Sequence, residues 1–548
     1  METIYGMDLG TSYCLVAEAR VRELLDKTRI KTLVDKNGEE KFSSVVHFED
    51  FDNVIVGDNA RRKLPYYPEK TVELIKLRLG NTNKINIKVG NKSKQLSPQE
   101  VSALTLRHFN KLHNNKIKKA ILTVPAYFDD NEKNATLQAG ELADIDIVEL
   151  IEEPSAAIMY HLYNKYNDNG LDFLKDHDNI NYLVFDFGGG TLDLSVIKVE
   201  LDSEGNVKPT VLAKGGDKDL GGNTIDKRFT ELIIKFLKRR NNDSFISKVE
   251  EEFKHYIEND SFRSSTSDEV KEFILNLKMM AEEAKINLSK NKSETIIPGR
   301  TNRYSSFEIR RQDFEEEVLE NGNISKRVIE ALYSILESIG DLEVHQLILV
   351  GGSSQIPHFK EKILKEFPRL KGRIKSSINY TNAIAKGAAI LGTIKSGKNI
   401  EPFGSNRCHN TIAHDIYIEH DDYKDLFIEK GLQFPEAAKK SSSFKIKHSL
   451  DTKIKIKLKE EYEYYNPIYN KRDKKEKVIK EFDFYHPFFY TDEEIKIKLK
   501  ENEKGTLSFL ASHSSTGEEI SFDSKKLFQL EDDDIKEAEK NMKNINIS

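Results

Sequence analysis

Three consecutive glycines between two aspartates constrain this chain more than any other feature. They lie in the stretch Asp186-Phe-Gly-Gly-Gly-Thr-Leu-Asp193, which follows the apolar run at 182–185 and precedes a second apolar run. We therefore predict a strand, a glycine turn and a second strand. Glycines leave backbone N–H groups open to a ligand, Thr191 adds a hydroxyl, and the two carboxylates can hold a hydrated cation. The hairpin therefore predicts a cradle for a magnesium-phosphate group.

A weaker copy of this hairpin stands near the start of the sequence. The run Ile4–Met7 leads into Asp8-Leu-Gly-Thr-Ser12, and strand-like residues 14–17 follow. A third glycine site, Gly351-Gly-Ser-Ser354, comes directly after the apolar strand at 347–350. Two such hairpins predict two related lobes that face one nucleotide.

Length and composition exclude several classes of function. A chain of 548 residues exceeds one hydrophobic core, so we expect two to four domains. A net charge of −6 with 32% charged residues gives no attraction to nucleic acid or anionic lipid, so neither is an expected partner. The two cysteines, Cys14 and Cys408, cannot form a disulfide framework, which fits a reducing compartment. Without a leader or a membrane span in the sequence, the expected location is cytoplasmic.

The pattern of apolar residues divides the chain into four parts. Strand-like and helix-like runs alternate over 1–395, which is typical of an α/β domain. The periodicity stops at 396–404, a predicted linker rich in Gly, Pro and Asn. Over 405–530 apolar residues stand at every second position, which predicts half-buried strands; examples are Ile454, Ile456, Leu458, Ile495, Ile497 and Leu499. Residues 531–548 predict a short helical tail with an acidic start.

Further motifs follow in a fixed order and point to a known family. They are Val124-Pro-Ala-Tyr-Phe128, Ile151-Glu-Glu-Pro-Ser-Ala-Ala157 and Asn382-Ala-Ile-Ala-Lys-Gly-Ala-Ala-Ile-Leu-Gly392. With the glycine sites, they resemble the ATPase domain of the heat-shock-70 chaperone family over 1–395. A fainter similarity continues into that family's β-sandwich peptide-binding domain. The resemblance implies an α/β fold class, with a two-lobed actin-like ATPase domain followed by a β-sandwich-like C-terminal domain.

The same resemblance implies the site residues. The phosphate loops would be Gly10, Thr11, Ser12 and Tyr13, then Gly188, Gly189, Gly190 and Thr191, with a third glycine loop at Gly351, Gly352, Ser353 and Gln355. The magnesium shell would be organised by Asp8, Asp186 and Asp193, and the catalytic residues would be Lys76, Glu153 and Thr191. Adenosine would contact Glu282, Lys285 and Ser289, whose spacings of three and four place them on one helical face. The implied cofactors are ATP or ADP and Mg²⁺.

Several positions depart from the family pattern. Gln355 replaces an arginine that stacks on adenine, so nucleotide binding should be weaker. Thr381 replaces an acidic residue, and Lys133 replaces the arginine that partners the switch proline, here Pro125. Glu149 stands where the family commonly has a basic residue that helps receive J-domain co-chaperones. This charge reversal argues against an ordinary J-domain partner.

Two larger features of the family are also changed. The Leu-rich linker that ends in Asp is missing, and 396–404 offers no equivalent apolar run. The helical lid is absent beyond its first turns at 531–543. We therefore expect that no lid covers a bound peptide and that peptides exchange fast.

Three functional hypotheses follow. The first is a divergent, lidless chaperone that hydrolyses ATP slowly and binds unfolded or extended apolar peptide segments in its C-terminal β-domain. The second is a non-hydrolysing nucleotide-binding partner, or nucleotide-exchange factor, for a conventional chaperone. The third takes only the shared fold, as a filament-forming actin relative or a small-molecule kinase, and the β-rich C-terminal third argues against it.

Overall fold

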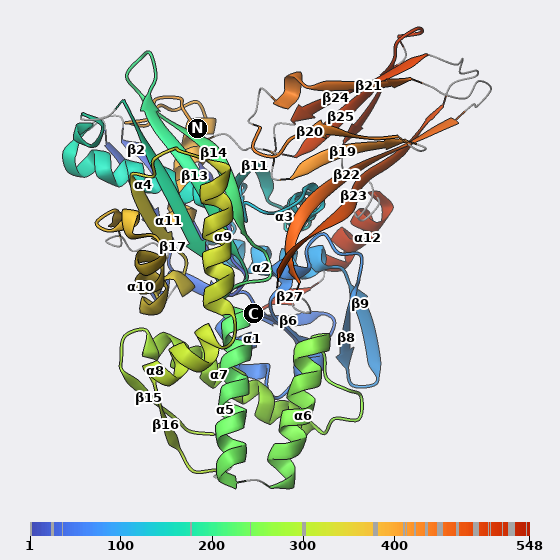
Figure 1. The fold of residues 1–548 in the computed structure, drawn as a ribbon. Helices are drawn as coiled ribbons and strands as arrows, with labels where there is room; N and C mark the ends of the chain where they lie inside the picture. Colours follow the sequence, from blue (N-terminus) through green and yellow to red (C-terminus); the bar gives the residue numbers. More distant parts are fainter. Residues whose placement is uncertain are drawn as a thin grey trace.

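The computed structural model places two α/β lobes side by side and a β-domain against the first of them (Figure 1). Most of the residues that the structure does not describe lie in the last third of the chain. The described residues are 3–22, 27–35, 37–175, 178–241, 243–298, 303–375, 382–408, 412, 414–420, 423–432, 437–445, 453–466, 471–485, 493–501, 504, 506–517, 519–523, 532–543 and 545–548.

Lobe I is built on a sheet in the order β11-β10-β1-β2-β3, with β4 paired to β2. Strand β1 is antiparallel to β2 and parallel to β10, which is parallel to β11. The strands are β1 (Ile4–Leu9), β2 (Tyr13–Arg22), β3 (Lys27–Thr32), β4 (Lys41–Ser43), β10 (Lys119–Val124) and β11 (Asp146–Glu152). Helices α2 (Pro98–Leu112) and α3 (Asp130–Leu142) pack on this lobe.

Lobe II repeats the pattern in the order β14-β13-β12-β17-β18. Strand β12 is antiparallel to β13 and parallel to β17, which is parallel to β18. The strands are β12 (Asn179–Phe187), β13 (Leu192–Leu201), β14 (Val207–Asp217), β17 (Gln346–Val350) and β18 (Ile374–Lys375). Each glycine hairpin therefore joins the central strand of its sheet to an antiparallel neighbour, and the prediction of two related lobes is confirmed.

Helices join the two lobes and extend them. Helix α4 (Glu153–Asn169) contacts β12 and β13, α11 (Ala383–Lys395) contacts β1 and β2, and the two helices pack together. Lobe II continues through α5 (Gly222–Asn241), α6 (Ser244–Asn259), α7 (Asp268–Leu288), β15 (Ser293–Ile296), β16 (Phe307–Arg310), α8 (Arg311–Phe314), α9 (Ile324–Ser338) and α10 (Pro357–Glu366). The outer part of lobe I holds β5 (Val46–Phe48), β6 (Asn53–Val56), α1 (Asp58–Lys63), β7 (Thr71–Val72), β8 (Ile85–Val89) and β9 (Lys92–Leu96).

The C-terminal domain is a sandwich of two antiparallel sheets. Their orders are β20-β19-β22-β23 and β21-β24-β25-β26. The strands are β19 (Asp415–His420), β20 (Tyr423–Ile428), β21 (Ser441–Lys445), β22 (Lys453–Asn466), β23 (Lys471–Tyr485), β24 (Glu494–Glu501), β25 (Leu507–His513) and β26 (Glu519–Asp523). The six isoleucines and leucines predicted to alternate inward are all buried in the core between these sheets. The predicted fold class is confirmed.

The connection between the domains is packed rather than free. No continuous apolar run was expected here, and the structure instead buries separate apolar residues, Ile400, Phe403 and Cys408, against α4, β12 and α11. Asn406 Nδ2 donates to Asp202 Oδ2 at 2.6 Å, which ties the segment to lobe II. The connection therefore runs along the junction of both lobes.

The last described segment returns to lobe I. Helix α12 (Asp532–Lys543) contacts α2 and α3, and β27 (Asn546–Ile547) pairs in parallel with β6. Figure 1 shows α12 beside lobe I and below the sandwich strands. The predicted helix is thus present, but the following strand was not predicted from the sequence.

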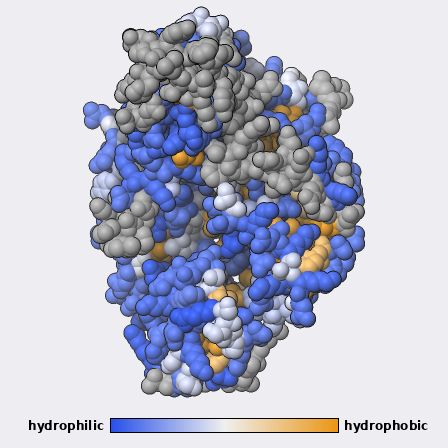
Figure 2. Space-filling view, turned by 90° about the vertical axis from the view of Figure 1, so that its right-hand side faces the viewer, coloured by the Kyte–Doolittle hydropathy of each residue, from blue (hydrophilic) through white to orange (hydrophobic). Residues whose placement is uncertain are grey.

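The visible surface agrees with the charged composition. The face turned toward the viewer in Figure 2 is mostly hydrophilic, with small separate apolar patches among the atoms coloured there. In the described part of the chain no helix combines the length and apolarity needed to cross a bilayer.

Candidate functional site

The two glycine hairpins meet at the junction of the lobes. A side chain at Gly190 would lie 2.6 Å from Thr11 Oγ1, and one at Gly189 would collide with the Ser12 hydroxyl. Only glycine permits this approach, because any Cβ would push the loops apart. The structure therefore brings Thr11 and Ser12 against the glycine triplet, as the paired-hairpin prediction requires.

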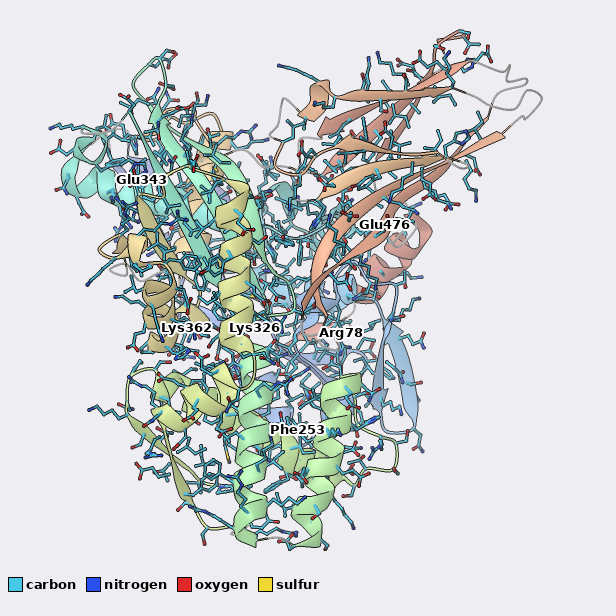
Figure 3. All side chains as sticks on the ribbon, in the orientation of Figure 1. Arg78, Phe253, Lys326, Glu343, Lys362 and Glu476 are labelled. Atoms are coloured by element: carbon cyan, nitrogen blue, oxygen red, sulfur yellow. The ribbon has the colours of Figure 1, made fainter. Side chains whose placement is uncertain are left out.

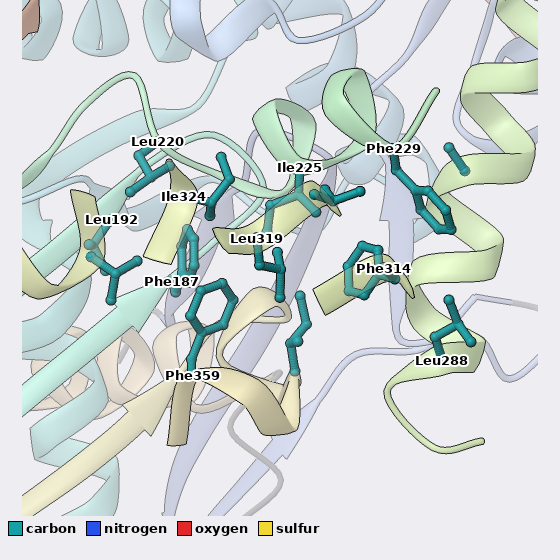
Figure 4. Close-up of a cluster of buried hydrophobic side chains, with 14 of the residues drawn as sticks. Phe187, Leu192, Leu220, Ile225, Phe229, Leu288, Phe314, Leu319, Ile324 and Phe359 are labelled. Atoms are coloured by element: carbon teal, nitrogen blue, oxygen red, sulfur yellow. The ribbon is translucent and has the colours of Figure 1, made fainter. Parts of the chain in front are cut away.

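Buried side chains hold the second glycine loop, at 188–191, in place. Phe187 and Leu192, which flank the turn, are fully buried, and the Phe187 ring lies 5.0 Å from that of Phe359 (Figure 4). The Gly188 N–H donates to the Thr191 carbonyl at 3.0 Å and closes the turn. An aromatic cluster thus fixes the backbone amides before any ligand arrives, which is the preorganisation that phosphate binding needs.

The third glycine site completes the floor of the cleft. Ser353 Oγ donates to the Gly188 carbonyl at 2.8 Å, and Gly351 adopts φ +81° beside the Phe187 carbonyl. A residue with a Cβ would be strained there and would collide with that carbonyl. Gly352 and Gln355 remain exposed. The third glycine loop is therefore in contact with the loop at 188–191.

Three aspartates lie at the base of the cleft and are almost completely buried: Asp8, Asp186 and Asp193. Burial, followed by the charge of Glu153, raises the pKa of Asp8 and of Asp193 to about 7 and that of Asp186 well above its usual range. Thr123 Oγ1 donates to Asp8 at 3.1 Å and Thr191 Oγ1 to Asp193 at 2.6 Å.

This donor set fits a hydrated magnesium ion. Asp186 Oδ2 is buried without a hydrogen-bond partner, and hard carboxylate oxygens are the ligands that Mg²⁺ prefers. Among the described residues no three His, Cys, Asp or Glu side chains converge closely enough to ligate one ion directly. The arrangement therefore suits an ion that keeps part of its water shell, with Asp8, Asp186 and Asp193 as its outer partners.

One buried lysine faces these acids. Lys76, 4% exposed, donates to Glu153 Oε1 in an ion pair between lobe I and the start of α4. Burial opposes its charge, but the carboxylates of Glu153 and Asp8 outweigh that effect and raise the pKa of Lys76. The lysine is therefore held protonated among carboxyl groups.

The predicted adenosine residues lie at one end of α7 and all have protein partners. Glu282 forms an ion pair with Arg61, whose Nη1 also donates to the Tyr13 hydroxyl at 2.8 Å. Lys285 pairs with Asp226 Oδ1 at 2.8 Å. The Ser289 hydroxyl donates to the Lys285 carbonyl at 2.9 Å.

Two parts of the site were missed in the sequence. Arg61 links lobe I to Glu282 in lobe II, and only the fold brings them together. Gly221 and Gly222 stand at the start of α5 against the loop at 188–191, where the Gly222 N–H donates to the Gly188 carbonyl at 3.0 Å. For Gly221 and Gly222 the sequence did offer a signal, because a glycine pair directly precedes a helix-like run.

Further ion pairs hold the outer parts of the lobes together. Arg78 of lobe I, which is labelled in Figure 3, pairs with Asp260 of lobe II at 3.1 Å. Lys271 of α7 pairs with Glu69 of lobe I at 2.9 Å. Lys278, two turns nearer the cleft, also pairs with Glu73 of lobe I. The cleft is therefore closed at its outer end.

The positions that depart from the family pattern have specific partners. Glu149 accepts from Arg407 Nη1 at 2.7 Å and pairs with Lys395 at 3.0 Å, so it anchors the interdomain connection. Lys133 lies 3.9 Å from Glu152, which also pairs with the buried Lys214. Position 381 lies outside the described residues.

The β-domain meets the ATPase domain mainly at the start of α3. The Leu507 N–H donates to Asp130 Oδ1 at 2.8 Å, and the Leu150 N–H donates to the Lys504 carbonyl at 3.0 Å. On the lobe II side, the Lys218 ammonium lies 4.1 Å from the centre of the Tyr462 ring. Strand β22 thus contacts lobe II, and β23 contacts lobe I through the ion pair of Lys477 with Asp129.

Acidic groups gather at this interface from both domains. The acidic residues are Asp129, which caps α3, Asp130 and Glu132 of α3, and Glu460 of β22. The cations near them are Lys133, Lys218 and Lys477, and His414 lies beside them. Burial is the main cause that raises the pKa of Asp130 to about 7 and that of Glu132 to about 8. The docked arrangement of the β-domain therefore favours the protonated forms of Asp130 and Glu132.

Comparison with known proteins gives consistent matches. A family model described as Hsp70 protein matches residues 4–547. The chaperone protein DnaK of Mycoplasmopsis agalactiae is 32% identical over 409 residues, which are 72% of this chain and 59% of that protein. The proteins of the same name from Mycoplasma mobile and Thermotoga maritima are 33% and 30% identical, over 72% of this chain and 59% and 60% of their own lengths. The match thus spans about three fifths of each relative.

Proposed function

Because this chain belongs to the Hsp70 family, we propose that it is an ATP-dependent chaperone that binds Mg·ATP between its lobes and hydrolyses it slowly. In this proposal its β-domain binds unfolded or extended apolar peptide segments. The observation that carries the proposal is the direct contact of the two glycine hairpins above buried Asp8, Asp186 and Asp193. The family resemblance predicted from the ordered motifs is confirmed. A cytoplasmic location remains a prediction.

The chain's own groups suit phosphoryl transfer to water. This reaction needs positioning and charge neutralisation more than covalent participation. Backbone amides of the glycine loops would hold the phosphates, Lys76 would face the γ-phosphate and the attacking water, and Thr191 would be oriented by Asp193. A bound Mg²⁺ would neutralise phosphate charge. Glu153 keeps Lys76 in place and protonated.

Slow turnover and weak nucleotide affinity are part of the proposal. Gln355 is exposed at the third glycine loop and cannot provide the cation–π contact that an arginine would give adenine. Glu282 and Arg61 are already paired, so a nucleotide has to exchange contacts with them or fit around them. Both features lower the net free energy gained when a nucleotide binds.

The experiment is a peptide titration in two nucleotide states. The affinity of a fluorescent apolar peptide is measured with saturating Mg·ATP and with Mg·ADP. A coupled chaperone binds the peptide at least tenfold more weakly with ATP, because the two ligands favour different domain arrangements. Equal affinities would remove the coupling claim.

A second candidate is a nucleotide-exchange factor for a conventional chaperone. The exposed Gln355 favours it, because a protein that turns over little ATP does not need a strong grip on adenine. Release of labelled ADP from a conventional chaperone, followed by stopped flow with and without this protein, separates the two candidates. Faster release would favour the second.

A further inference from the structure

Residues 532–543 and 545–548, which follow the β-domain, form a further attachment to lobe I. Strand β27 extends the small lobe I sheet by pairing with the edge of β6. The Asn546 N–H donates to the Asp52 carbonyl at 2.7 Å, and the Ser548 N–H donates to the Val54 carbonyl at 2.9 Å. The Val56 N–H donates in return to the Ser548 carbonyl at 3.3 Å. This is recognition by strand addition, in which main-chain bonds supply affinity.

Side chains add specificity to this pairing. Apolar groups of the segment enter the lobe I core, each no more than 6% exposed: Ala538, Met542, Ile545 and Ile547. Ala538 and Met542 are one turn apart on α12, and Ile545 and Ile547 share one face of the extended part. The lobe therefore receives a short helix followed by an apolar-x-apolar extended segment.

Lobe I also supplies polar partners for the main chain. Arg107 donates to the Met542 carbonyl and Lys111 to the Ile547 carbonyl, both from α2. These bonds satisfy carbonyls at and beyond the end of α12, where no further helical turn can do so. Because both donors are charged, the bonds are stronger than neutral ones.

One side of this contact opens into a cavity. Its volume is about 830 Å³, and its polar lining includes Asn110, Lys118, Glu141, Asp144 and Glu539. The segment is thus buried against the lobe on one side and borders polar space on the other. Only a two-residue strand joins the sheet, and β5 pairs with both β6 and β7 without it. These features suit a segment that detaches without unfolding the lobe.

We propose that lobe I carries a peptide-binding site, formed by the β6 edge and the α2–α3 surface, whose occupant is this chain's own segment 532–548. Bound in this way, the segment acts as a latch that holds the β-domain against lobe I. The β-domain is then held by the connection at 400–408, by its interface with the start of α3 and by the latch. The site lies apart from the nucleotide loops, so this inference does not depend on the proposed ATPase function.

The test uses full-length chains without nucleotide. Ile547→Asp places a charge in the lobe I core and should release the latch. Lys540→Asp places an aspartate at an exposed position of the same segment, outside the strand pairing and the apolar contacts, and is the matched control. The probe is a fluorescent synthetic peptide with the sequence of 532–548. We expect saturable binding to Ile547→Asp that is at least tenfold tighter than binding to the parent or the control, whose sites are occupied.

Amide hydrogen exchange follows release at two positions. Exchange at Val56 should rise at least tenfold in Ile547→Asp and fall again when the peptide is added. Exchange at Leu507, whose N–H donates to Asp130 across the domain interface, should rise as well. If Val56 is released and Leu507 stays protected, the segment does not control docking and the latch proposal is wrong.

A second variant covers the case in which Ile547→Asp does not fold. Lys111→Met removes one donor to the segment without placing a charge in the core. It should raise exchange at Val56 by a smaller factor and allow measurable peptide binding. Unchanged exchange at Val56 in this variant, or equal peptide binding by parent and variant, would overturn the proposed site.

Discussion

Replacing Lys76 by methionine separates catalysis from stability at the centre of the cleft. Lys76 and Glu153 form a buried ion pair, and removal of one partner leaves the other charge without compensation. Breaking such a pair costs about 3–5 kcal/mol of folding free energy. This is a large part of a typical stability of about 5–15 kcal/mol, so the variant should fold with a clearly lower Tm.

Lys76→Met should also hydrolyse ATP more slowly. This loss of turnover should be larger than a lower folded fraction of the variant can explain. Removing one preorganised group that stabilises transition-state charge lowers kcat by about 10²- to 10³-fold. The matched control is Lys214→Met, because the Lys214 side chain is as buried as that of Lys76 and pairs with Glu152, the neighbour of Glu153. It should lose similar stability and keep turnover within about threefold of the parent, since it faces none of the three cleft aspartates.

The assay is single-turnover ATP hydrolysis at a temperature where circular dichroism shows both variants folded. A third variant, Lys76→Met with Glu153→Gln, removes the uncompensated charge and should recover most of the Tm without recovering turnover. If folded Lys76→Met hydrolyses ATP at nearly the parent rate, the catalytic assignment is refuted. If Lys214→Met is equally inactive, the loss reflects general damage to the buried pairs.

Three further outcomes follow from particular contacts. Glu149→Lys should lower the Tm by an amount equivalent to about 1 kcal/mol, because it repels Arg407, and adding Arg407→Glu should recover most of the loss. Gln355→Arg should tighten ADP binding about threefold to tenfold in calorimetry, since arginine can stack on adenine; unchanged affinity would place adenine elsewhere. Docking should weaken as the pH rises from about 4, where these carboxyl groups ordinarily titrate, to about 8, because over that range the raised pKa values of Asp130 and Glu132 mean that the docked state binds more protons than the undocked state. Hydrogen exchange across the interface checks this, and the double variant Asp130→Asn with Glu132→Gln should show a smaller dependence on pH.

Local patterns were enough to predict the parts of the fold that depend on local chemistry. The glycine triplet lies between two strands because only glycine permits the approach of Thr11, and this requirement is visible in the sequence. Period-two apolar residues such as Ile454 and Ile456 were predicted to face a core and do so. Both signals need only a few neighbouring residues.

Contacts between distant segments were not predictable in the same way. Arg61 has no local signal, because its partners Tyr13 and Glu282 come from different lobes. Strand β27 has two residues, too few for any periodicity, and it forms only because β6 offers an unpaired edge. The role of Glu149 became clear only with Arg407 and Lys395 beside it. These features depend on tertiary placement, which a single sequence does not display.

The central claim is that the two glycine hairpins form one Mg·ATP site, and calorimetric titration of ATP tests it most directly. The parent should bind one ATP per chain in the presence of Mg²⁺. Gly190→Val should weaken this binding by at least tenfold, because its side chain would collide with Thr11 and push the loops apart. If the parent binds no ATP, or if Gly190→Val binds it as tightly as the parent, the account of the cleft is contradicted.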